Sequence, residues 1–122
     1  MESSEERYRT AIWPLGSSRA TTIPPRILTI TQAPDGDDAE VRWKYDSDRN
    51  IYVEFGRASD ADAHEQYAYR TTMQKRSDGS RATTIPADIL RHDAEDGVDE
   101  VIWHFDLKNE HPVRPSFTEN DD

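Results

Sequence analysis

The sequence contains no cysteine, only three lysines, and no long run of apolar residues. The absence of cysteine excludes disulfide bonds, thiol catalysis and cysteine-ligated metal sites. No apolar run approaches the ~18 residues that a membrane-spanning helix requires. The first residues, Met1 to Glu6, are polar and acidic, unlike a secretory signal. We therefore expect a cytoplasmic protein that makes no contact with a membrane.

The charge is strongly one-sided, with 25 acidic against 15 basic residues and a formal net charge of −10. Chains rich in Asp and poor in Lys resemble cytosolic proteins of halophiles that accumulate salt. There the Debye length falls to about 3 Å at 1 M, and self-repulsion is screened. The composition thus predicts a halophilic protein that unfolds in dilute buffer and refolds in molar KCl. Equal stability in both solutions would contradict this hypothesis.

Apolar residues make up only 34% of the chain and charged residues 33%, a balance close to that of disordered segments. The three Trp, five Tyr and three Phe argue for a fold, because most of them alternate with polar residues as in half-buried strands. With 122 residues, the chain has room for one domain with a modest core.

A heptapeptide, S-R-A-T-T-I-P, occurs twice, at residues 18–24 and again at 80–86. The similarity extends upstream to Y-R-T and downstream to V-x-W-x-[YF]-D in both copies. Two units are too few for a solenoid, and each is too small to bury a core alone, so we expect one joint domain. The predicted segments are a first repeat at 8–57, a linker at 58–68, a second repeat at 69–117, and flexible ends at 1–7 and 118–122.

Each repeat predicts the same local structure. A strand ends in the β-branched run Thr-Thr-Ile, and the proline after it begins a short helix, at about 25–31 and about 87–92. Apolar residues then alternate with polar ones, as at 41–55, which indicates a β-hairpin with one apolar face. The last strand of the second repeat contains two prolines within 111–115, which confine it to a sheet edge or a loop.

Together these segments resemble the AbrB/MazE/SpoVT family of swapped-hairpin proteins. The resemblance rests on S-R-A-T-T-I-P-x-x-I-L with a glycine near its start, Gly16 or Gly79, followed by V-x-W-x-[YF]-D. It implies a mainly β fold with one short helix per repeat, in which the two repeats exchange hairpins to close one β-barrel. The usual dimer of short chains would here be an intrachain pseudo-dimer, monomeric in solution unless pseudo-dimers associate further.

Most members of this family are DNA-binding regulators of transcription, so the resemblance implies double-stranded DNA as the partner. Family members contact DNA through arginines before and within the T-x-I-P strand. The matching positions lie on the first strand of each repeat, beside each T-T-I-P and in the second copy's connecting loop: Arg9, Arg70, Arg19, Arg81, Lys75 and Arg76.

The distribution of charge supports DNA binding despite the negative total. Residues 7–24 contain three arginines and no acidic residue, and residues 70–86 contain four cations against Asp78 alone. Acidic residues gather later in each repeat, six at 35–48 and six at 93–106. Such polarity suits a phosphate-binding surface, although arginines also cover exposed strands with no such role. The predicted basic face consists of Arg7, Arg9, Arg19, Arg70, Lys75, Arg76 and Arg81.

A second function class stays open at the level of sequence. The chain would then be a protein-interaction module, antitoxin-like or a regulatory partner, without sequence-specific DNA binding. Residues 118–122 are too short for the toxin-wrapping tail of an antitoxin, which argues against that version. Two roles are open for Trp13, which either packs on the core or contacts a partner or a DNA groove.

No motif points to catalysis, a cofactor or a metal. The four histidines are scattered and lack the short spacing of metal ligands. The acidic turns at 35–38 and 93–97 lack the twelve-residue pattern of a calcium loop. Because no Gly-rich phosphate loop or nucleophile–base motif occurs either, we expect no enzyme activity.

Overall fold

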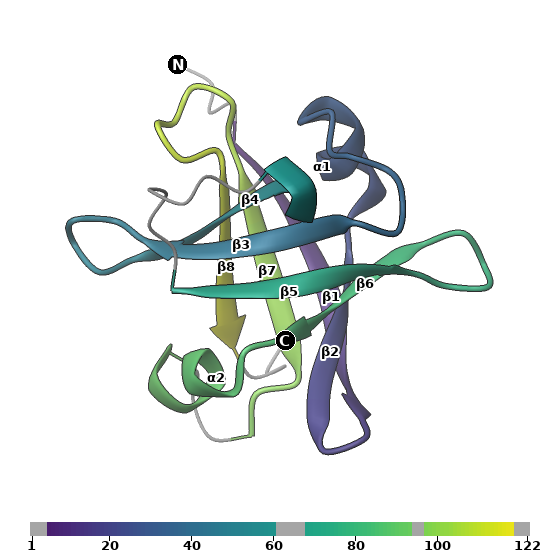
Figure 1. Ribbon diagram of the computed structural model, residues 1–122. Coiled ribbons are helices and arrows are strands. Elements are labelled where there is room, and N and C mark those ends of the chain that lie inside the picture. Colours follow the sequence, from purple (N-terminus) through teal and green to yellow (C-terminus); the bar gives the residue numbers. More distant parts are fainter. Residues whose placement is uncertain (1–4, 61–67, 94–96, 119–122) are drawn as a thin grey trace.

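The computed structural model describes residues 5–60, 68–93 and 97–118. Within them the chain forms eight β-strands, two short α-helices and one 3₁₀ turn, η1 (Figure 1). The first repeat contains β1 (Glu6–Leu15), β2 (Ser18–Ile23), α1 (Pro25–Ile30), β3 (Ala39–Tyr45), β4 (Ile51–Arg57) and η1 (Ala58–Asp60). The second contains β5 (Tyr69–Lys75), β6 (Arg81–Ile85), α2 (Ala87–Asp93), β7 (Glu100–Phe105) and β8 (Val113–Thr118).

The proline after each T-T-I segment ends a strand and begins a helix, as the sequence predicts. Pro25 occupies the first turn of α1, where its missing N–H needs no partner. In α2, Asp88 stands in the first turn, where the helix dipole favours a negative charge. Both helices agree with their predicted ranges to within one residue. Neither has the length or apolar character to cross a membrane.

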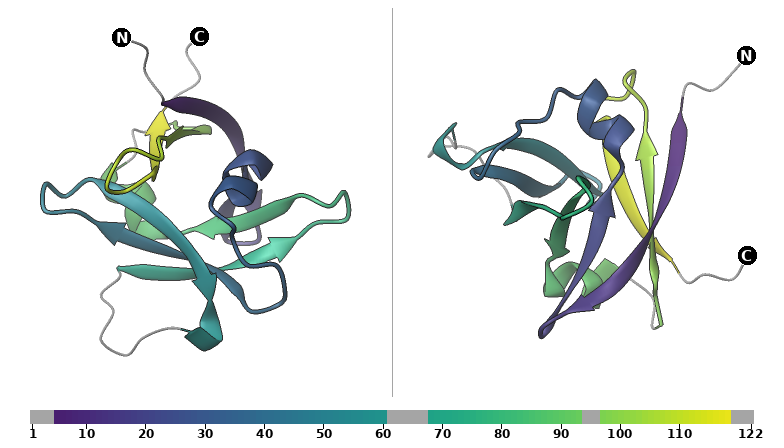
Figure 2. Two further views of the ribbon diagram at one scale, coloured as in Figure 1. Left: turned by 90° about the horizontal axis from the view of Figure 1, so that it is seen from above. Right: turned by 90° about the vertical axis from the view of Figure 1, so that its right-hand side faces the viewer.

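All neighbouring strands are antiparallel and follow the order β4-β3-β5-β6-β2-β1-β7-β8. The T-T-I strands β2 and β6 pair at the centre of this order, with Thr21 opposite Thr83. The two end strands, β4 and β8, contact each other. The sheet therefore curls into a nearly closed barrel (Figures 1 and 2). The predicted mainly β fold with one short helix per repeat is confirmed.

The C-terminal hairpin of each repeat adds to the first strand of the other repeat. β3 pairs with β5, which places Arg42 opposite Arg70. β7 pairs with β1, which places Ile102 opposite Arg9. Figure 1 shows β3 and β5 running side by side across the barrel. The first strand of each repeat thus finds one of its two neighbours only in the other repeat.

A hydrogen-bonded relay joins one exchanged hairpin to the T-T-I strand of the first repeat. Trp103 Nε1 donates to Thr10 Oγ1 at 2.8 Å, and Thr10 Oγ1 lies 2.7 Å from Thr21 Oγ1. Thr21 Oγ1 donates in turn to the carbonyl oxygen of Ala11 at 2.8 Å. Because Thr21 has a single hydroxyl proton, Thr10 is the donor between the two threonines.

The second repeat contains the same relay. Trp43 Nε1 donates to Thr71 Oγ1 at 2.9 Å, Thr71 Oγ1 lies 2.6 Å from Thr83 Oγ1, and Thr83 Oγ1 donates to the carbonyl of Thr72 at 3.1 Å. Thr21 and Thr83 are 0% and 1% exposed, so each hydroxyl needs an internal partner. The relay therefore gives a physical reason for the presence of T-T-I in both repeats.

Trp43 and Trp103 are both fully buried at equivalent positions, as predicted. They belong to one hydrophobic cluster that draws residues from both repeats. Its most deeply buried aliphatic side chains are Ile23, Ile27, Val41, Ile85, Ile89 and Val101. The two repeats therefore share one core.

The outer segments differ in part from the expectation. β8 lies at one end of the strand order, which confirms the edge position that its prolines predicted. Residues 6, 7 and 118, expected in flexible ends, belong to β1 and β8, because β7 supplies ladder partners such as Phe105 for Glu6 and Glu100 for Thr118. The expected linker begins with η1, and its residues 61–67 lie outside the described residues, as do the ends 1–4 and 119–122.

Candidate nucleic-acid interface

Strand alternation turns the first-strand arginines outward. On β1, Arg7 and Arg9 are exposed, while Tyr8 and Thr10 between and after them are half-buried toward the core. On β5, Arg70 takes the place that corresponds to Arg9 in the repeat and also points outward. The period of two thus places equivalent arginines on two separate strands of one barrel surface.

The outward positions of the four central strands carry no acidic residue. We call this surface the outer face; it lies opposite the side of β1, β2, β5 and β6 on which Thr21 and Thr83 enter the core. Its cations are Arg7, Arg9 and Arg70, and Arg76 continues it from the turn after β5. The remaining residues on this side of the strands are Ala11, Trp13, Leu15, Ser18, Ala20, Thr22, Thr72, Gln74, Ala82 and Thr84. Of these, Ala20 and Ala82 are buried, at 1% and 3% exposure.

A glutamate on each neighbouring strand borders the outer face. Arg9 Nη1 lies 3.2 Å from Glu100 Oε1, and the Arg9 side chain is 57% exposed. Arg70 Nη2 lies 2.7 Å from Glu40 Oε1, and its side chain is 34% exposed. These two ion pairs are equivalent in the repeat. The Arg9 pair is open to solvent, whereas the Arg70 pair is half-buried.

Glu40 also binds a second arginine, which makes the β3–β5 side the more rigid of the two. Arg42 Nε donates to Glu40 Oε2 at 2.7 Å, and Arg42 Nη2 donates to the carbonyl oxygen of Arg57 at 2.8 Å. Burial alone raises the pKa of Glu40, but hydrogen bonds from Arg70 and Arg42 outweigh it, and the pKa lies below its ordinary value. Glu40 is therefore a carboxylate that holds two arginines in place.

Trp13 of the β1–β2 hairpin contacts Arg76 of the β5–β6 hairpin, and both hairpins project from the barrel in Figure 1. Cζ of Arg76 lies 4.7 Å from the centre of the Trp13 ring, within the range of a cation–π contact. Strands β6 and β2 separate the two residues, and their outward Ala20 and Ala82 leave room for the contact. Trp13 is half-buried and lies outside the core cluster. Trp13 therefore belongs to the surface of the barrel and not to its core.

Arg81 and Arg19 do not belong to the outer face. Their places opposite Ile23 and Ile85 put them on the inward side of β6 and β2, near the ends of those strands. Arg81 is ion-paired with Asp35, and its side chain is 12% exposed. Arg19 donates to the carbonyl oxygen of Val98 at 3.3 Å. Each arginine thus reaches the loop that follows a helix.

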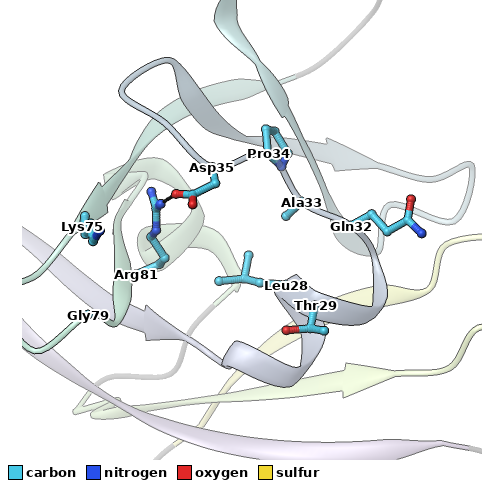
Figure 3. Close-up of a pocket in the computed structure, with 9 residues that line it drawn as sticks. All are labelled: Leu28, Thr29, Gln32, Ala33, Pro34, Asp35, Lys75, Gly79 and Arg81. Atoms are coloured by element: carbon cyan, nitrogen blue, oxygen red, sulfur yellow. Dashed lines mark ion pairs between the residues drawn. The ribbon is translucent and has the colours of Figure 1, made fainter.

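Figure 3 shows the surroundings of Arg81 in a hollow of about 370 Å³. The dashed ion pair joins Arg81 to Asp35, and Lys75 lies at the edge of the same hollow. Leu28 of α1 contributes an apolar part of the lining. The Asp35 carboxylate neutralises one cation here, so this hollow is a poorer phosphate site than the outer face.

The structure therefore separates the seven predicted residues into two groups. Arg7, Arg9, Arg70 and Arg76 share the outer face, whereas Arg19, Arg81 and Lys75 lie toward the ends of the barrel. Sequence reasoning did not single out Glu40 and Glu100. The signal for them was present, since a glutamate directly precedes V-x-W in both repeats. In the described ranges, no group of three or more His, Asp or Glu side chains is placed to hold a metal ion.

A scan of protein-family models, a search of curated proteins and a search of solved structures each return no match for this chain. The resemblance of the two T-T-I-P segments to the AbrB/MazE/SpoVT family therefore stays a prediction.

Proposed function

We propose that the chain is an AbrB-like, swapped-hairpin pseudo-dimer that binds double-stranded DNA as a regulator of transcription. The pairing of each C-terminal hairpin with the first strand of the other repeat supports the swapped-hairpin part. The observation that carries DNA binding is the outer face, where Arg7, Arg9 and Arg70 project from β1 and β5 and Arg76 follows β5. Its carboxylates, Glu5, Glu40 and Glu100, lie only at its border, each in an ion pair with one of these arginines.

The spacing of the cations suits a duplex. β2 and β6 separate β1 from β5, so these two strands lie about 14 Å apart, three times the usual strand spacing. The registers of the intervening strands bring Arg9 into line with Arg76, whereas Arg70 lies six residues, about 20 Å, further along β5. The major groove of B-DNA is about 12 Å wide. Arg9 and Arg76, at this separation, reach phosphates on both sides of a groove, and Arg70 reaches a phosphate further along the duplex, which fixes the register of the protein.

The exposed pair between Arg9 and Glu100 leaves Arg9 free to exchange partners. Exposed ion pairs contribute only about 0–1 kcal/mol, so a DNA phosphate can replace the carboxylate at little cost. Arg70 is held by buried Glu40 and exchanges less readily. We therefore assign the larger share of phosphate contact to Arg9, Arg7 and Arg76.

The two ends of the outer face differ, which favours an asymmetric operator. The turn of the β5–β6 hairpin begins with Arg76, whereas the β1–β2 hairpin has the uncharged Pro14 and Leu15 at the corresponding place. A symmetric site would leave one half without its cation. The protein is therefore expected to bind in one orientation on a non-palindromic sequence.

The test is fluorescence anisotropy with a labelled duplex from the region upstream of the protein's own gene, titrated over a series of KCl concentrations. The variant Arg9→Gln/Arg76→Gln removes two cations from the outer face. The control Arg91→Gln/Lys108→Gln removes two exposed cations elsewhere. The outer-face variant should bind more weakly and lower the slope of log K against log[KCl] by about 2, since each lost phosphate contact contributes about 0.9. The control should retain the wild-type slope.

A labelled duplex of unrelated sequence completes the design. Wild type should bind the upstream duplex more tightly than the unrelated one at every KCl concentration, because base-edge contacts add to the phosphate contacts. Equal losses in the two variants would remove the outer face from the proposal. Folded wild type that binds neither duplex would favour the alternative class, a protein-interaction module.

A further inference from the structure

The seam between the two end strands of the barrel contains a second chemically distinct site. β4 and β8 contact each other, but the strand order ends at them, so no ladder joins them among the described strands. A hollow of about 330 Å³ opens on this seam, near the lower end of the ~300–1,000 Å³ range of small-molecule pockets. Its lining includes Arg49, Ile51, His104, Arg114, Ser116 and Phe117.

Arg114 brings an unused donor to this hollow. Its Nη2 lies 3.3 Å from Glu5 Oε2, while its Nε is buried and has no hydrogen-bond partner among the described residues. A buried guanidinium nitrogen without a partner is costly unless a ligand or water satisfies it. The guanidinium of Arg114 is therefore incompletely hydrogen-bonded beside the hollow.

Further donors surround the same space. Arg49 lies in the β3–β4 turn with φ of 66°, is exposed, and has no ion pair within the described residues. His104 and Ser116 already have partners beside this space. His104 Nε2 lies 3.0 Å from Ser116 Oγ, His104 Nδ1 lies 3.5 Å from Glu5 Oε1, and Ser116 Oγ donates to the carbonyl oxygen of Ile102 at 3.5 Å. Glu5 is the carboxylate at the edge, and it is already bound by Arg7 at 2.9 Å as well as by Arg114.

Apolar side chains form the rest of the lining. Ile51 and Phe117 are 8% and 7% exposed, and Pro115 is buried beside them. An inorganic ion would leave this apolar surface uncovered. A ligand with a ring or a short carbon body attached to its anionic group covers it and satisfies the cations at once.

The pseudo-symmetry of the barrel provides an internal comparison. Thr31, Arg42 and Pro112 line part of a second hollow of about 290 Å³ on the same seam, and the rest of its lining is Val53, Glu54, Phe55 and Val113. In the repeat, these correspond to Pro115, Ser116, Phe117 and Ile51 of the first hollow. The frame is the same, but Glu54 stands where the first hollow has Ser116. The second hollow thus has a carboxylate and one arginine, Arg42, that Glu40 already binds, whereas the first has two arginines and no carboxylate in its lining.

We propose that the Arg49–Arg114 hollow binds a small organic oxyanion, a molecule with one carboxylate or phosphate group on a compact apolar body. The guanidinium of Arg114 offers its fork to two oxygens of the anion, and Arg49 closes the site from the β3–β4 turn. Asn50, which also lines the hollow, supplies a neutral amide donor, and Phe117 packs against the apolar body. The ligand bridges β4 and β8 and so joins the two repeats across the seam. This inference is independent of DNA binding.

The experiment is an NMR titration of the full ¹⁵N-labelled chain in KCl, with phenyl phosphate and benzoate as the two organic anions. Benzyl alcohol is the uncharged control, and inorganic phosphate is the control without an apolar body. We expect saturable shifts of the Ser116, Phe117 and Ile51 amides with one or both organic anions, and weaker binding of both controls. The larger response of phenyl phosphate or benzoate identifies the anionic group.

Two variants locate the site. Arg114→Gln and Arg49→Gln should each raise the Kd for the organic anion about tenfold or more, since each removes a charge-assisted hydrogen-bond donor worth about one decade or more. Arg91→Gln, on α2, is the matched control and should leave the Kd unchanged. If Arg114→Gln does not fold, Arg49→Gln carries the test, because its side chain is exposed. Absence of saturable shifts, equal binding of benzyl alcohol, or unchanged Kd in Arg49→Gln would overturn the proposal.

Discussion

The indole nitrogen of Trp103 donates a hydrogen bond to the hydroxyl of Thr10, which lies 93 positions earlier in the chain, at 2.8 Å. Trp43 and Thr71 form the equivalent bond at 2.9 Å. Both bonds cross from a hairpin of one repeat to the first strand of the other, inside the shared core. They make the exchange of hairpins specific, because a misplaced hairpin would leave a buried indole N–H unpaired.

Replacement of Thr10 by Val should destabilise the protein by about 1–3 kcal/mol. The change keeps the shape of the side chain but leaves the buried indole N–H of Trp103 without a hydrogen-bond acceptor. Thr22→Val is the matched control on the neighbouring outer face, where the side chain is half-exposed, and it should change stability little. Urea unfolding at fixed KCl measures both. The double variant Trp103→Phe/Thr10→Val should cost less than the sum of its single changes. Strict additivity would show that the bond contributes nothing.

Acid should weaken the fold through Glu40. Burial raises the pKa of this carboxyl, but its bonds to Arg70 and Arg42 lower it further, so the folded pKa is depressed. The stabilisation is then complete above the unfolded pKa, about 4.3, and is lost as pH falls through the folded value. Unfolding free energies measured between pH 7 and pH 3 should decline at the acid end.

Glu40→Gln should remove this part of the pH dependence and lower stability at neutral pH by about 2–4 kcal/mol, since it leaves buried Arg42 without its carboxylate. Glu54→Gln removes an exposed carboxylate bound to Lys44 and serves as the control, with a loss of about 1 kcal/mol at most. A variant at Glu40 that retains the full acid-end decline would assign it to other carboxyls, such as Glu5.

Gly56 admits the Arg42 guanidinium, and an added methyl group should expel it. A Cβ at position 56 would lie 2.7 Å from Cζ of Arg42, which cannot move without losing Glu40 and the carbonyl of Arg57. Gly56→Ala should therefore cost about 1–3 kcal/mol in urea unfolding. In the background of Arg42→Ala, the same change should cost much less. An equal cost in both backgrounds would point to the backbone instead of the guanidinium.

The first repeat on its own should have no folded monomer. A chain of residues 1–57 keeps β1 and β3 but lacks their partners β7 and β5. It should be unfolded when dilute and should fold by pairing with a second copy, so circular dichroism should depend on concentration while light scattering reports a dimer. Addition of residues 68–122 should compete for the same strands. A folded monomer of 1–57 at the lowest concentration would contradict the exchange.

Local pattern was sufficient for much of this fold. The β-branched T-T-I run, the proline after it and the alternation around Trp43 predicted strands and helices to within a residue or two, because sterics and burial act over a few neighbours. The inward direction of Arg19 was also readable, since it stands four residues before buried Ile23 on the same side of β2. The predicted basic face included Arg19 because of its charge and did not take into account which side of the strand it occupies.

The fate of Arg70 was not readable in the same way. Its ion pair depends on Glu40, 30 positions away, which also binds Arg42, and the Arg42 guanidinium fits only because Gly56 has no side chain. The sequence shows four polar or small residues in three separate segments, and only strand pairing brings them into one network. The hollow beside Arg114 is similar, because β4 and β8 meet only when the sheet curls.

The pairing of each hairpin with a strand of the other repeat also sets the order of events during translation. Glu6 of β1 pairs with Phe105 of β7, so β1 waits until most of the chain has left the ribosome. At about 5–20 residues per second, the nascent first repeat exposes unpaired strand edges for several seconds. Neighbouring ribosomes on one message hold identical edges that offer the same pairing. The peptide connection to the second repeat keeps the correct partner at high effective concentration. It thereby favours a barrel formed by one chain over pairing between several chains.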